Sequence, residues 1–159
     1  MTNDDARIVA LAITYHLGRP GSETDATTFR RHDRGLQSVG AALHPQLDAA
    51  QVSLDVTPYQ IHRLDEALLG ITNELKQYEL SHRRSAVPGL EAAIAALFPA
   101  LAPGQSEDDA TALDLVTQVV LLRRRLANTV REAAATLEAE GAAAEEAARA
   151  RRPWWRFWG

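Results

Sequence analysis

Glu79 and His82 are the residues whose spacing comes nearest to a metal site. They form the only Glu-x-x-His sequence in the chain, and this spacing places a carboxylate and an imidazole one turn apart on one side of a helix. A di-iron bundle needs the motif twice, with further glutamates from two other helices, and only one copy is present. His82 can instead complete an apolar helix seam, while Glu79 pairs with Arg83 four residues later. The sequence therefore favours a structural role for both residues, and it predicts no bound metal and no cofactor.

Other catalytic patterns are missing from the sequence. The chain has no cysteine, which excludes thiolate metal sites, disulfides and a cysteine nucleophile. It contains no Gly-x-Ser-x-Gly and no Ser-x-x-Lys, and its nine glycines never gather into a phosphate-binding loop. We therefore predict a protein that is not an enzyme, with a helical-bundle enzyme or metal protein as the least favoured alternative.

Two short basic clusters, residues 30–34 and 123–125, invite a nucleic-acid interpretation. Three consecutive residues on a helix fan across about 200°, so the run of three arginines cannot form one flat phosphate-binding face. The whole chain is acidic, with a formal net charge of −4. Nucleic acid is therefore disfavoured as a partner. Arg123 falls on an apolar stripe, and we predict that its charged head pairs with an acid from another helix.

The C-terminal tail is the most unusual part of the sequence. All three tryptophans lie within the last six residues, interleaved with arginine. Aromatic and arginine side chains are the preferred anchors of protein interfaces, and they also suit the headgroup region of a membrane or the stacking of single-stranded bases. A fourth interpretation is that the tail folds back onto an apolar patch. We assign partner binding to the tail's aromatic and basic residues, which are Arg152, Trp154, Trp155, Arg156, Phe157 and Trp158.

The elements that must position these residues are all helical, because apolar residues recur at helical spacing and strict alternation is nearly absent. Asn3 is expected to cap the first helix, and Thr57-Pro58 is a strong helix start. Ser106 with Asp109 resembles a capping box that begins the longest helix. The expected helices cover about residues 3–18, 28–43, 58–84, 88–98 and 106–152, and a seam of the bundle kind runs through Ile61, Leu64, Leu68, Ile71, Leu75, Tyr78 and His82.

The predicted fold is an all-α bundle of four to five helices, with a long C-terminal helix projecting beyond the body. A helix of roughly 45 residues is about 65–70 Å long, well over the width of a domain of this size. We place the bundle domain at residues 1–140 and an Ala/Arg-rich extension with its aromatic-basic tail at 141–159, with the packed part of the helix ending near Leu137. Gly141 is the expected point of bending or fraying. A homodimer is expected, through the long helix or through the 61–82 seam.

These patterns lead to one functional hypothesis and its alternatives. We expect an interaction or adaptor protein that presents its Trp/Arg tail to a protein partner. The alternative is a helical bundle that associates peripherally with an anionic membrane surface. The apolar runs are far shorter than a membrane span and the N-terminus is acidic, so the expected location is cytoplasmic, with membrane association at most peripheral.

Overall fold

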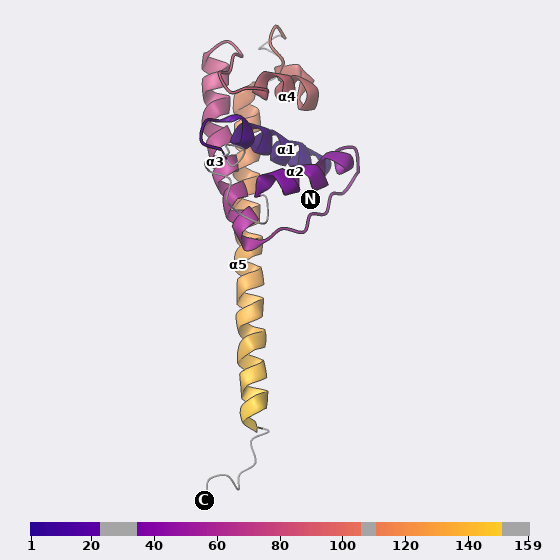
Figure 1. The fold of residues 1–159 in the computed structure, drawn as a ribbon, viewed down its shortest axis with the longest axis vertical. Helices are drawn as coiled ribbons and strands as arrows, with labels where there is room; N and C mark the ends of the chain where they lie inside the picture. The colour runs from indigo at the N-terminus through magenta and orange to yellow at the C-terminus, as the bar shows by residue number, and fades with distance from the viewer. Residues whose placement is uncertain (23–34, 106–110, 151–159) are drawn as a thin grey trace, which may run out of the picture. The chain divides into compact units, whose positions relative to one another are not determined.

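The computed structural model of the chain describes residues 1–22, 35–105 and 111–150 (Figure 1). Over these ranges the protein is all-α, as predicted, and an isolated bridge between Thr2 and Gln51 is the only β-type pairing. The chain divides into two compact units, residues 1–123 and the residues from 124 onward. The described elements are α1 (Asn3–Gly18), α2 (Leu36–Leu43), the 3₁₀ turn η1 (His44–Gln46), α3 (Pro58–Leu80), α4 (Leu90–Leu97), the 3₁₀ turn η2 (Pro99–Leu101) and α5 (Ala112–Ala150).

The first helix covers the predicted residues, but its N-cap lies one residue earlier than expected. Thr2, and not Asn3, is the N-cap, and its hydroxyl accepts the backbone N–H of Asp5 at 3.2 Å. The Asp5 carboxylate accepts the Thr2 N–H in return, which completes a capping box. Asn3 has a different use, because its side-chain amide donates to the carbonyls of Leu47 and Ala49. This residue ties the start of α1 to the segment after η1.

Helix α3 begins where the Thr57-Pro58 pair predicts. Thr57 and Gln60 form a second capping box, and the Gln60 amide also donates to the Gly35 carbonyl and the Ser38 hydroxyl at the start of α2. The predicted seam is confirmed over most of its length, and its side chains form the buried face of the helix. The buried seam residues are Leu64, Leu68, Ile71, Leu75 and Tyr78.

The end of α3 differs from the prediction. The helix stops at Leu80, so His82 does not complete the seam and is exposed. The Arg83 N–H donates to the Tyr78 carbonyl and the His82 N–H to the Glu79 carbonyl, which is the bond pattern of a Schellman cap. His82 has a φ of 51° and Arg83 a φ of 63°, a left-handed conformation that glycine usually adopts. No glycine marks this turn in the sequence, so the sequence pattern predicts a helix that continues to residue 84.

Helix α1 packs against α2, α3 and α4 and so lies at the centre of the first unit. Its core residues include Ile8, Val9, Leu11, Ala12 and Ile13. Of the helix expected at 28–43, Leu36–Leu43 is described, and residues 28–34 lie outside the described ranges. The fourth predicted helix is shorter than expected, with Leu90 and Ile94 buried on its inner face.

Helix α5 begins at Ala112, six residues after the predicted Ser106, and residues 106–110 lie outside the described part of the chain. Its inward stripe consists of Ala112, Leu115, Val119 and Leu122. Among the described residues of α5, Leu122 is the last buried one, and Leu137 is 68% exposed. That the packed part of the helix ends near Leu137 stays a prediction. Leu113 and Val120, each next in sequence to a residue of this stripe, are exposed.

Candidate interaction surface

The tail residues to which the sequence assigns partner binding lie outside the described residues. They are Arg152, Trp154, Trp155, Arg156, Phe157 and Trp158. The helix that leads to them, α5, is described as far as Ala150 and runs without a break through Gly141. The domain boundary placed at Gly141 stays a prediction.

Glu79 and His82 do not form a shared site in the described part of the structure, because Glu79 binds the start of α5 and His82 is exposed after the end of α3. The Glu79 carboxylate accepts the backbone N–H of Ala112 at 2.9 Å, so it satisfies one of the free amide groups at the start of α5. The predicted partner of Glu79, Arg83, instead donates to the carbonyls of Ala100 and Gln105 and is buried. Glu79 therefore joins α3 to α5, and Arg83 joins the end of α3 to the loop after α4. Within the described ranges, no three His, Asp or Glu side chains lie close enough together to hold a metal ion.

Arg123 forms the ion pair that the sequence predicts. Its guanidinium donates two hydrogen bonds to the Asp65 carboxylate on α3, at 2.6 and 2.8 Å. This bidentate contact raises the pKa of Arg123, mainly through the hydrogen bonding. Since Asp65 meets Arg123 and Glu79 meets Ala112, the first turns of α5 run antiparallel to α3. The pair thus serves to hold two helices together.

His16 is a buried polar residue for which the sequence alone indicates no role. Its ring nitrogens lie 3.2 Å from the Arg19 and Arg63 guanidinium groups, and Arg63 in turn pairs with Glu66. Burial, and next the two arginine charges, lower the pKa of His16 to about 4. The signal was present, because His16 follows Ala12 by four residues and so shares the buried face of α1.

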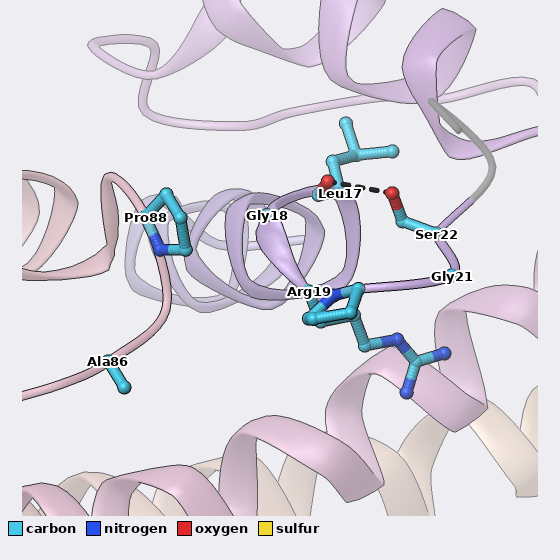
Figure 2. Close-up of a pocket in the computed structure, with 8 residues that line it drawn as sticks. Leu17, Gly18, Arg19, Gly21, Ser22, Ala86 and Pro88 are labelled. Atoms are coloured by element: carbon cyan, nitrogen blue, oxygen red, sulfur yellow. Dashed lines mark hydrogen bonds between the residues drawn. The ribbon is translucent and has the colours of Figure 1, made fainter. Parts of the chain in front are cut away.

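A pocket of about 420 Å³ lies between the end of α1 and the segment before α4 (Figure 2). Among the described residues that line it, Arg19 is the single charged one, and its side chain is directed away from Ser22. The Arg19 guanidinium contacts His16 and lies 6.0 Å from the centre of the Tyr15 ring. The Ser22 hydroxyl donates to the Leu17 carbonyl at 2.9 Å. Both polar side chains already bind groups of this chain.

The most conspicuous surface of the described chain lies on α5. Every residue from 127 to 147 is exposed, including Val130 at 38% and Leu137 at 68%. These two side chains belong to a row that recurs at steps of four and three along the helix, which is the spacing of a coiled-coil seam. We name this row the outer seam, and it consists of Ala127, Val130, Ala134, Leu137, Gly141 and Ala144.

The residues of the outer seam are exposed, and they lie on the helix that leads to the Trp/Arg tail. None of the described helices is long and apolar enough to cross a membrane. No family model, no curated protein and no solved structure matches the chain.

Proposed function

We propose that the protein is a non-enzymatic interaction or adaptor protein, and that residues 152–158 dock onto a protein partner. The observation that carries the proposal is the exposure of α5 from residue 127 to residue 147. A helix that is exposed over this length is suited to presenting the segment at its C-terminal end, and that segment holds every tryptophan of the chain. Tryptophan and arginine are among the residues that contribute most to the binding free energy of protein interfaces.

Pull-down with the full chain and with a chain truncated after Arg152 tests the proposal. We expect one or more proteins to be captured by the full chain alone, and each is then purified and tested for direct binding. Replacement of Trp154, Trp155 or Trp158 by alanine is expected to cost about 2 kcal/mol of binding free energy at the dominant anchor. Capture that is equal with and without residues 153–159 would contradict the proposal.

A second candidate is peripheral association with an anionic membrane surface, which the same residue types favour. Trp rings suit the headgroup region, and arginines are attracted to anionic lipid. The double variant Arg152→Lys/Arg156→Lys distinguishes the two candidates, because it keeps the charge but removes bidentate hydrogen bonding. Binding to a protein partner is expected to weaken in this variant, whereas co-sedimentation with anionic vesicles depends on charge and is expected to persist. A cytoplasmic location accompanies both candidates as a prediction.

A further inference from the structure

We propose that residues 124–147 of α5 pair with the same residues of a second copy of the chain, in an antiparallel two-stranded coiled coil. The outer seam forms its core. The 61–82 seam is not available for this purpose, because most of its large side chains are buried within one chain, namely Leu64, Leu68, Ile71, Leu75 and Tyr78. The inference goes beyond the function proposed for the tail and does not depend on it.

Size complementarity within the outer seam favours the antiparallel direction. In an antiparallel pair, the row of small residues (127, 134, 141) faces the row at 130, 137 and 144 on the other helix, which holds the two large side chains of the seam, Val130 and Leu137. With the pair centred between residues 135 and 136, Leu137 faces Ala134 of the second copy and Val130 faces Gly141. In a parallel pair, Gly141 faces Gly141 and Leu137 faces Leu137, which leaves a gap in one layer and crowds another.

The charges beside the outer seam favour the same direction and register. Arg124, Arg131, Glu138 and Glu145 occupy one flank of the seam at intervals of seven residues. In the antiparallel pair this flank meets itself, so that Arg131 lies beside Glu138 of the second copy and Arg124 beside Glu145. Two-fold symmetry repeats each contact, which gives four oppositely charged pairs.

Other arrangements of the same two helices bring like charges together. In a parallel pair Glu140 lies beside Glu145 of the second copy, on both sides of the seam. An antiparallel pair shifted by one heptad places Arg131 against Arg131 in one direction, or Glu138 against Glu138 in the other. Like charges at these flanking positions are the usual means by which coiled coils reject a register or partner. The register centred between residues 135 and 136 is therefore the one that the sequence supports.

Sedimentation equilibrium on the full chain tests the pairing. We expect a dimer, and we expect Leu137→Glu to convert it to a monomer because a charge is placed in the centre of the seam. Leu69→Glu is the matched control, since Leu69 is also exposed but lies on α3. It should leave the dimer intact. Helical content, measured by circular dichroism, checks that each variant is folded. A monomeric wild-type protein, or a dimer insensitive to Leu137→Glu, would overturn the proposal.

Charge reversal tests the register. Arg131→Glu or Glu138→Arg alone is expected to raise the dimer Kd roughly tenfold or more, since each change makes two symmetric contacts repulsive. The double variant Arg131→Glu/Glu138→Arg should restore the wild-type Kd. Residues 131 and 138 are seven positions apart in one helix, so they do not contact each other within a chain. Glu132→Arg, on the outer face of α5, is the control and should have no effect. Additive losses in the double variant would overturn the proposed register.

Cross-linking through introduced cysteines tests whether the two helices are antiparallel. The chain has no native cysteine, so every disulfide must involve an introduced one. A mixture of Val130→Cys and Gly141→Cys chains should form a disulfide between the two variants. Neither variant should cross-link to itself, because the like residues lie about 16 Å apart along the antiparallel pair. Self-linking of both variants would show a parallel pair and overturn the proposal. The dimer should also survive truncation after Arg152, which separates this proposal from tail-mediated association.

Discussion

At the scale of single residues, His16 makes the stability of the protein depend on pH. Its pKa is about 4 in the folded protein, against an ordinary value of 6.5, because of burial and of the neighbouring Arg19 and Arg63, with Glu66 acting in the opposite direction. Between these values the unfolded chain binds a proton at His16 and the folded protein does not. The free energy of unfolding therefore decreases as the pH falls from 6.5 toward 4.

We expect the His16 contribution to reach about 1.4 kcal/mol per pH unit at most. Urea unfolding of the wild type and of His16→Asn at several pH values in this window measures it. The variant should be less stable at neutral pH and should lose part of the slope, while other titrating groups contribute equally to both proteins. Equal slopes would show that His16 binds its proton equally well in the folded and unfolded chain.

His82 gives a second prediction at this scale. Its φ of 51° is a conformation that costs a residue with a Cβ about 1 kcal/mol relative to glycine. We expect His82→Gly to raise the free energy of unfolding by roughly that amount, since the Schellman cap keeps its backbone hydrogen bonds. His82→Ala is the control and should give no gain. Thermal or urea unfolding measures the difference, and a destabilised His82→Gly protein would indicate that the imidazole has a structural role.

At the scale of elements, the stability of the first unit depends on the inner face of α3. Leu75 is completely buried and Leu69, on the same helix, is 46% exposed. Leu75→Ala is expected to lower the free energy of unfolding by roughly 2–5 kcal/mol, because it leaves a cavity in the core. The same change at Leu69 should cost less than about 1 kcal/mol. Similar losses at both positions would contradict the assignment of the seam to the core.

The start of α3 is predictable from the sequence, whereas its end is not. Thr57-Pro58 marks the start of α3 correctly, because a cap hydroxyl and an N1 proline act within one turn. The end of α3 has no such local mark, since its turn is closed by Arg83, which is tied to carbonyls 17 and 22 residues away. The sequence predicted that Arg123 would meet an acid of another helix. It could not identify Asp65, because the choice depends on how α5 packs against α3.

At the scale of the whole molecule, tryptophan fluorescence reports on the C-terminal tail alone, whereas tyrosine fluorescence reports on the first unit. All three tryptophans are at positions 154–158, and the buried Tyr78 donates its hydroxyl to the Leu101 carbonyl in the first unit. Truncation after Arg152 is expected to leave the unfolding midpoint, followed by tyrosine emission or circular dichroism, nearly unchanged. Pro153 cannot continue a helix, so the sequence predicts a tail that is separable from the fold.

Tryptophan emission of the full chain supplies the complementary measurement. We expect it to be red-shifted and readily quenched by acrylamide in the isolated protein, and blue-shifted on addition of the binding partner. Blue-shifted, protected emission in the isolated protein, together with a lower midpoint after truncation, would mean that the tail packs in the core.

The continuous course of α5 to Ala150 has a consequence for valency. In the proposed antiparallel pair, two helices that each continue to Ala150 point in opposite directions, and we expect their Ala150 ends to lie about 45 Å apart. Two docking segments that start so far apart are poorly placed to grip one small partner together, and well placed to hold two partner molecules at once. We expect such a dimer to act as a cross-bridge, whose avidity for a surface carrying many copies of the partner exceeds the affinity of either tail alone.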